Sequence, residues 1–102
     1  MERKWNVLWA EKSLEDLLDI KHFISNDSPT RAESWIHELY NAGVNLAGFP
    51  MRGRIVPEFN QENLRELLLE HYRLVYRINK KTIEIVTVFE GHRQLKQRDL
   101  KK

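Results

Sequence analysis

Four side chains in the second half of the chain carry the groups that metal-free cleavage of a phosphodiester bond requires. Such cleavage of RNA needs a base for the 2′-hydroxyl, an acid for the leaving oxygen and cations for the charge that develops on phosphorus. Glu58 and His92 are the candidate base and acid, because an imidazole with a pKa of about 6.5 serves either role at neutral pH. Arg73 and Arg93 are the candidate phosphate ligands, since a guanidinium is planar and always protonated.

Other arginines could position a nucleic-acid backbone or another target: Arg54, Arg65 and Arg77. Each candidate also has a plain structural interpretation. Glu58 could simply pair with one of the first two of these arginines, Arg77 could be a solvated sheet residue, and His92 could be a turn residue. Arg73 has the strongest functional case, because an arginine in the middle of a strand is costly to bury unless it is used or paired.

The composition limits the other kinds of chemistry. The chain has 102 residues, 41% of them hydrophobic and 31% charged, which suits one small core. Cysteine is absent, so a disulfide, a thiolate zinc site and a cysteine nucleophile are excluded. The four histidines lack the spacing of metal ligands. We therefore expect neither a metal nor a cofactor.

Charge is distributed unevenly along the chain. Residues 1–50 carry five basic and eight acidic residues, whereas residues 51–102 carry twelve basic and seven acidic ones. This imbalance suggests a polyanion or an acidic partner near the second half, or else an ordinary solvated face. No apolar run reaches the roughly 20 residues of a membrane span, and residues 1–5 are not followed by the apolar run of a secretory signal. We expect a cytoplasmic protein without membrane contact.

Hydrophobic periodicity predicts a strand and two helices in the first half. Residues 5–9 are short and β-rich, which predicts a strand, and residues 10–25 have helical spacing with an acidic outer side. This helix begins either at Ala10 or at a capping box that starts at Ser13. Ser28 suits an N-cap and Pro29 a first helical position, so a second helix follows and ends at 48–50.

The period changes to that of strands after residue 50. Residues 54–58 form a short extended piece that Pro57 places at an edge or an end, and 64–70 is apolar enough for a strand. Residues 72–78 alternate cleanly, and 82–89 give the strongest strand signal, typical of a central strand. The order β-α-α-β-β-β predicts one α+β domain over 1–102, with a twisted, mainly antiparallel sheet and both helices on one face. The basic tail, 91–102, has too little apolar content to dock firmly, so it should be mobile or form a short helix.

Four segments together resemble the RelE/ParE superfamily of bacterial toxins: 52–58 (RGRIVPE), 64–67 (LREL), 72–78 (YRLVYRI) and 88–93 (VFEGHR). These proteins are the toxin halves of type II toxin–antitoxin systems, which arrest growth and stabilise plasmids. The resemblance covers nearly the whole chain. It implies a cytoplasmic toxin held silent by an antitoxin encoded beside it, in a toxin–antitoxin hetero-oligomer.

The superfamily has two branches with different targets. One cleaves messenger RNA on the ribosome as an endoribonuclease, and the other inhibits DNA gyrase without catalysis. The arginines of the RNA-cleaving branch match Arg73 and Arg93, but its preceding basic pair is reduced to Arg65 and its C-terminal tyrosine has no counterpart after Tyr76. The candidate catalytic set slightly favours ribosome-dependent RNA cleavage. Gyrase inhibition is the alternative, and a small binding module without toxicity is the third interpretation.

Overall fold

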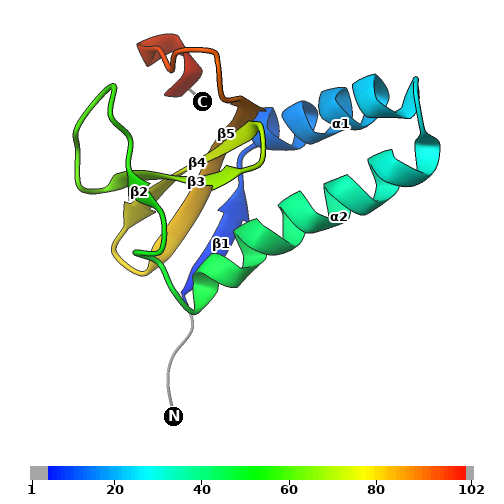
Figure 1. The fold of residues 1–102 in the computed structure, drawn as a ribbon. Helices are drawn as coiled ribbons and strands as arrows, with labels where there is room; N and C mark the ends of the chain where they lie inside the picture. The colour runs from blue at the N-terminus through cyan, green and yellow to red at the C-terminus, as the bar shows by residue number, and fades with distance from the viewer. Residues whose placement is uncertain (1–4, 101–102) are drawn as a thin grey trace.

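The chain folds into a five-stranded sheet with two helices packed on one face (Figure 1). The structure is a computed structural model that describes residues 5–100. The elements in chain order are β1 (Asn6–Trp9), α1 (Glu11–Ser25), α2 (Pro29–Val44), a 3-10 turn (Asn45–Ala47), β2 (Arg54–Ile55), β3 (Leu64–Leu69), β4 (Tyr72–Asn79), β5 (Thr82–Glu90) and a second 3-10 turn (Gln97–Leu100). In residues 5–100, no helix is long and apolar enough to cross a membrane.

The sheet has the strand order β1-β5-β4-β3-β2. Its last four strands in sequence pair antiparallel, whereas β1 pairs parallel with β5. The predicted α+β class and the mainly antiparallel sheet are confirmed. β5 is an interior strand, as its sequence predicted, although β4 is the middle one. β2 is an edge strand of two residues, in keeping with Pro57 just beyond it.

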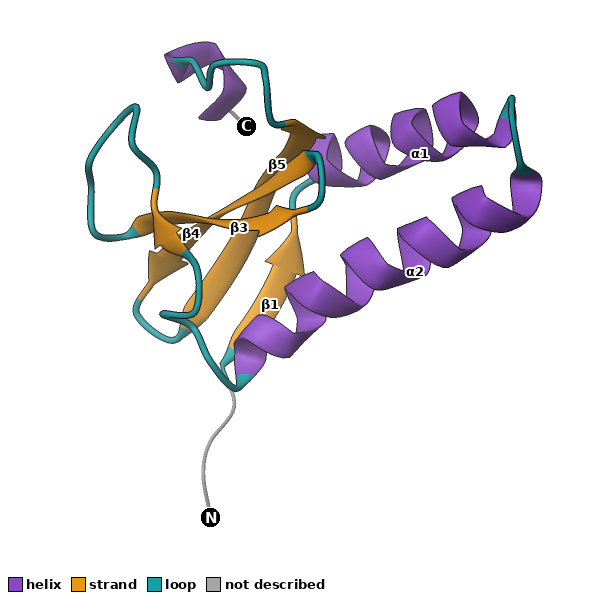
Figure 2. Cartoon of the chain, in the orientation of Figure 1, coloured by secondary structure: helices purple, strands orange, loops and turns teal. Residues whose placement is uncertain are grey.

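The helix boundaries follow from local capping. The hydroxyl of Ser28 accepts a hydrogen bond from the Arg31 N–H at 3.2 Å, and Pro29 occupies the first turn of α2, as predicted. Helix α1 begins at Glu11 with Ala10 as its N-cap. Ser13 instead donates to the Ala10 carbonyl at 2.6 Å, so the earlier of the two predicted starts is correct. The two helices lie side by side as an antiparallel hairpin (Figure 2).

The sheet carries a hydrophobic cluster on each face. The larger one lies under the helices and includes Leu17, Leu39, Leu74, Ile83 and Ile85. The smaller one, here called the outer cluster, consists of Val56, Leu64, Val75, Phe89 and Leu95. It is covered by the segment between β2 and β3 and by the C-terminal segment (Figure 1). The outer face of the sheet is therefore also a packed face.

The C-terminal segment docks more firmly than its composition predicted. A short helix does form at Gln97–Leu100, but the expectation of weak docking is wrong. Leu95 is only 3% exposed within the outer cluster, and Asp99 is buried, where it accepts the Lys96 N–H. One apolar anchor and one capping carboxylate hold this short tail, so low apolar content did not prevent docking. Residues 101–102 of the predicted tail lie outside the described residues.

We predict that Gly43→Ala destabilises the fold by about 1–3 kcal/mol. A Cβ at Gly43 would lie 2.5 Å from the Trp9 ring, which packs on this part of α2. Alanine favours a helix over glycine by about 1 kcal/mol, so the clash must outweigh that gain. Urea unfolding measures the change. Gly48→Ala is the control, because a Cβ there meets nothing nearer than 4.0 Å and should be tolerated.

Candidate functional site

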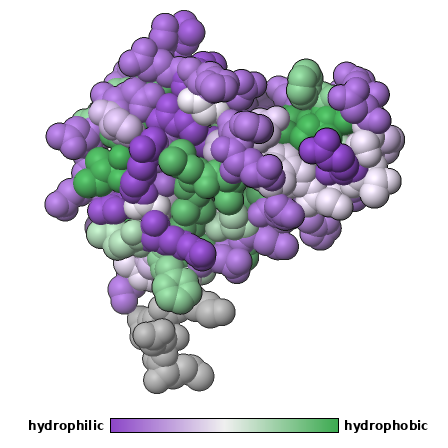
Figure 3. Space-filling view, viewed as in Figure 1, coloured by the Kyte–Doolittle hydropathy of each residue, from purple (hydrophilic) through white to green (hydrophobic). Residues whose placement is uncertain are grey.

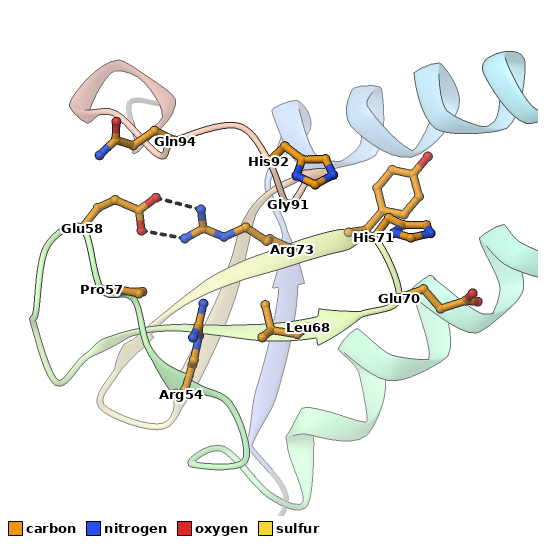
Figure 4. Close-up of a pocket in the computed structure, with 11 residues that line it drawn as sticks. Arg54, Pro57, Glu58, Leu68, Glu70, His71, Arg73, Gly91, His92 and Gln94 are labelled. Carbon is orange, nitrogen blue, oxygen red and sulfur yellow. Dashed lines mark hydrogen bonds and ion pairs between the residues drawn. The ribbon is translucent and has the colours of Figure 1, made fainter.

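A cavity of about 570 Å³ on the outer face brings together four of the seven predicted site residues. Its lining includes Arg54, Glu58, Arg73 and His92 (Figure 4). They come from β2, the segment that follows it, β4 and the residues just after β5. Strand ends and strand centres thus converge on one depression, as the catalytic hypothesis requires. The other three predicted residues are not part of its lining.

Arg73 lies at the base of this cavity in a bidentate ion pair with Glu58. Its Nη1 and Nη2 atoms donate to the two carboxylate oxygens, each at 2.7 Å (Figure 4). Nη1 also donates to the Arg93 carbonyl at 3.2 Å. The Arg73 side chain is 7% exposed. Glu58 therefore pairs with Arg73, and the interpretation that it pairs with Arg54 or Arg65 is wrong.

Glu66 extends this pair into a chain of charges. Its carboxylate is fully buried, with one oxygen 2.5 Å from Arg73 Nε and the other 2.7 Å from Arg54 Nε. We call Arg54, Glu66, Arg73 and Glu58 the ion network. Two arginines and two carboxylates alternate in it, so the buried charges compensate one another.

Sequence reasoning missed Glu66, although a signal was present. Leu68 is opposite Arg73 in the β3–β4 pairing, so Glu66 lies two residues away on the same face of the sheet. A mid-strand arginine needs an acidic partner when it is buried. Glu66 was the acidic residue that the neighbouring strand offered on that face.

The segment that leads into β2 is held by a buried tyrosine. The Tyr76 hydroxyl accepts the Gly53 N–H at 2.9 Å and donates to the Pro50 carbonyl at 2.7 Å. Glycine is required next to it, because a Cβ at Gly53 would lie 2.6 Å from the Glu66 carbonyl oxygen. These contacts place Arg54 beside Glu66 at the edge of the cavity.

His92 and Arg93 diverge although they are adjacent in sequence. The His92 side chain is 87% exposed at the rim of the cavity, with Nε2 3.9 Å from a Glu90 oxygen. The Arg93 guanidinium instead lies over the Phe89 ring at 4.5 Å and pairs with Asp99 at 3.2 Å. In this conformation only the main chain of Arg93 reaches Arg73.

Arg65 and Arg77 have partners away from the cavity. Arg65 donates to the carbonyls of Glu62 and Gly53, both at 2.9 Å. Arg77 donates to Glu84 at 3.2 Å across the β4–β5 pair, with 30% of its side chain exposed. Neither arginine therefore shares a surface with the ion network. Within residues 5–100, no three histidine or acidic side chains are placed to hold a metal ion.

Comparison with known proteins shows which family the chain belongs to. The family model described as "ParE toxin of type II toxin-antitoxin system, parDE" matches residues 7–95. The chain belongs to the ParE toxin family. It is thus the toxin component of a type II toxin–antitoxin system, and the resemblance to the RelE/ParE superfamily is confirmed.

Two solved structures share the fold of this ParE-family toxin. The first is from a chromosomal ParDE system of P. aeruginosa, with 21% identity, a TM-score of 0.71 and coverage of 87% of this chain and 98% of that one. The second is from the RelBE2 toxin–antitoxin complex of Mycobacterium tuberculosis, with 20% identity, a TM-score of 0.64 and coverage of 85% and 98%. No protein with curated annotation matches the chain.

The ion network sets the electrostatics of the ParE-family toxin's cavity. The pKa of Glu58 is lowered from 4.5 to about 2, mainly by the hydrogen bonds that Arg73 donates to it. Burial alone would raise this pKa, whereas the hydrogen bond from the Leu95 N–H lowers it further. The hydrogen bonds that Arg73 donates to Glu58 and Glu66 raise its own pKa. A carboxylate with so low a pKa is fully ionised at neutral pH, so it has no proton to donate and binds one only weakly.

Glu58 makes the free energy of unfolding of the toxin depend on pH in the acidic range. Because its pKa is depressed in the folded state, the stabilisation is complete above about pH 4.5 and is lost as the pH falls towards 2. We predict that the free energy of unfolding falls more steeply over this range in the wild type than in Glu58→Gln. Urea unfolding at a series of pH values measures both slopes. Parallel curves would contradict this role of the Glu58–Arg73 pair.

Proposed function

We propose that this toxin arrests growth by binding DNA gyrase, without cleaving a bond itself. The observation that carries the proposal is the bidentate pairing of Arg73 with Glu58 inside a buried ion network. Two of the four candidate catalytic residues, Glu58 and Arg73, are thus paired with each other and contribute to the folded structure. Membership of the ParE toxin family supports the same branch of the superfamily.

The chemistry of the pair argues against a role in RNA cleavage. Arg73 directs its Nε to Glu66 and both terminal nitrogens to Glu58, so a phosphate would have to displace a carboxylate. Glu58 also accepts the Leu95 N–H at 2.8 Å, so moving it would release the C-terminal segment as well. A general base works best with a pKa near the operating pH, and that of Glu58 is about 2.

Ribosome-dependent cleavage of messenger RNA is the second candidate function. The observation in its favour is that Arg54, Arg73 and His92 line one cavity. His92 is exposed there, so its imidazole could reach a bound RNA. In this mechanism the ribosome would supply substrate placement, and Glu58 would have to leave Arg73 before a phosphate could bind.

We further propose a cytoplasmic antitoxin as the partner, in a toxin–antitoxin hetero-oligomer. Family membership supports an antitoxin, and α1 and α2 expose apolar side chains that an amphipathic segment could cover. Leu14 and Tyr40 are each 45% exposed, and Leu18 is 65% exposed. A helix–helix homodimer is the competing explanation for this surface. A short acidic protein in the neighbouring reading frame would support the antitoxin, and its absence would favour the homodimer.

Induction in cells separates the two targets. We predict that the toxin causes double-strand DNA breaks and filamentation, with messages left intact, and that His92→Ala is as toxic as the wild type. A ribonuclease would lose activity by about 10²–10⁴-fold on removal of its acid or base. Protein synthesis and DNA replication are assayed in parallel after induction. An immediate stop in translation with cut messages, abolished in His92→Ala, would reverse the proposal.

A further inference from the structure

The segment between α2 and β2 exposes two large apolar side chains, Phe49 and Met51, which we call the loop patch. Phe49 is 66% exposed and Met51 is 61% exposed, and both border an open hollow of about 740 Å³. The segment lies at the opposite end of α2 from the helix-hairpin turn (Figure 1). Figure 3 shows hydrophobic side chains at the lower end of the molecule, where α2 leads towards β2. Aromatic residues and methionine are enriched where proteins contact one another.

The backbone of this segment is anchored to the sheet. The carbonyl of Pro50, which lies between the two exposed residues, accepts a hydrogen bond at 2.7 Å from the hydroxyl of Tyr76, a fully buried residue. The Arg52 N–H donates to the Phe49 carbonyl at 3.1 Å, which closes a turn with proline at its second position. The loop patch is therefore displayed by a fixed backbone, and groups that are already ordered lose less conformational entropy when they bind.

Positive charge borders the loop patch. Residues 39–57 contain no aspartate or glutamate. Arg52 is exposed at the hollow and makes no ion pair within residues 5–100. The Arg65 guanidinium reaches the same segment, because its Nη1 donates to the Gly53 carbonyl at 2.9 Å. A complementary partner therefore offers an apolar pocket with acidic side chains beside it.

The loop patch is distinct from the surfaces described above. The cavity with the ion network has a different lining, and the helix surface proposed for the antitoxin includes Leu14 and Leu18 on α1. A toxin needs a surface for its target as well as one for its antitoxin. Val44, the last residue of α2, is 38% exposed and precedes the loop patch closely in the chain. An antitoxin laid along α2 could therefore shield the loop patch from a target.

We propose that the loop patch is an anchor by which the toxin binds DNA gyrase. Phe49 and Met51 enter an apolar pocket of gyrase, and an acidic side chain of gyrase lies against Arg52. The proposal rests on the gyrase target proposed above and names a contact surface for it. A standard interface buries about 800 Å² of each partner, which is more than one loop offers, so further contacts surround this anchor. A few well-buried residues nonetheless carry most of the binding energy of an interface.

A matched pair of phenylalanine substitutions tests the anchor. Phe49→Ser and Phe23→Ser each remove an exposed ring, 66% and 72% exposed, and Phe23 lies near the helix-hairpin turn at the other end of the helices. Phe49→Ser raises the toxin concentration needed for half-inhibition of gyrase supercoiling by at least about tenfold, as removal of an interface anchor does. Phe23→Ser changes it by less than about twofold. Urea unfolding shows that both variants are folded, because neither side chain is buried.

The outcomes separate this proposal from the one on which it rests. If the wild type inhibits gyrase and Phe49→Ser inhibits it equally, the anchor is wrong and the gyrase target stands. If the wild type does not inhibit gyrase, both proposals fail. Binding of each variant to the protein from the neighbouring reading frame is measured alongside. Full gyrase inhibition by Phe49→Ser with loss of that binding would assign the loop patch to the antitoxin and overturn the proposal.

Reversal of one charge provides a second readout. Arg52→Glu should raise the half-inhibition concentration by about tenfold, whereas Arg31→Glu, at an exposed arginine in the first turn of α2, should change it by less than about twofold. Inhibition by the wild type should also weaken as salt is added, because salt screens exposed charges. Equal inhibition by Arg52→Glu and the wild type would contradict an acidic partner at the loop patch.

Discussion

Replacing Arg73 by alanine should lower the free energy of unfolding by about 3–5 kcal/mol, because it removes the counter-charge that Glu58 and Glu66 share. Glu66 is fully buried and would keep only Arg54, and Glu58 would lose both of its guanidinium hydrogen bonds. For a domain of this size such a loss is a large part of the total stability. Urea unfolding followed by far-UV circular dichroism measures it.

Arg77→Ala is the matched control for this prediction. Arg77 is on the same strand and makes one cross-strand ion pair, but it is 30% exposed. Removing such a partly exposed pair should cost about 0–1 kcal/mol. A loss below about 1 kcal/mol for Arg73→Ala would contradict the view that the ion network belongs to the fold. Arg73 would then be available for a ligand.

The second large effect is expected at the C-terminal segment. Leu95→Asp would place a carboxylate in the outer cluster, where Leu95 is 3% exposed beside Phe89 and Val75. Burying an unpaired charge is more costly than the docking of one short segment can balance, so the segment should detach. If this segment presents the gyrase-binding surface, the concentration needed for half-inhibition of supercoiling rises by about tenfold or more.

Arg98→Ala is the control, since Arg98 is exposed in the same segment and should leave docking unchanged. The Leu95→Asp protein should remain folded, because the larger cluster under the helices does not include Leu95. Circular dichroism checks this before inhibition is measured. Retained secondary structure together with full gyrase inhibition would show that the docked tail is not needed for activity.

Features that depend on nearby residues were predictable from the sequence. The Ser28–Pro29 helix start, the turn between 79 and 82 and the alternation of β4 each follow from local backbone chemistry. The parallel pairing of β1 with β5 was not predicted, because it joins residues more than 70 positions apart. No local pattern specifies such a partner.

The candidate site was predictable as a set of residues and not as a set of contacts. Side-chain chemistry identified Glu58, Arg73 and His92 as candidates, and these do line one cavity. The sequence could not show that Arg73 binds Glu58, because the pairing depends on how the segment after β2 folds back over β4. Glu66 and Leu95 were overlooked for the same reason, since each acts through residues on other elements.

A supercoiling assay with purified toxin and purified gyrase tests directly whether this toxin acts on gyrase without catalysis. We predict that the wild type and His92→Ala inhibit gyrase equally. We also predict that neither protein cuts a messenger RNA on translating ribosomes in a parallel reaction. Full supercoiling in the presence of the wild-type toxin, together with messages cut by the wild type and spared by His92→Ala, would contradict it.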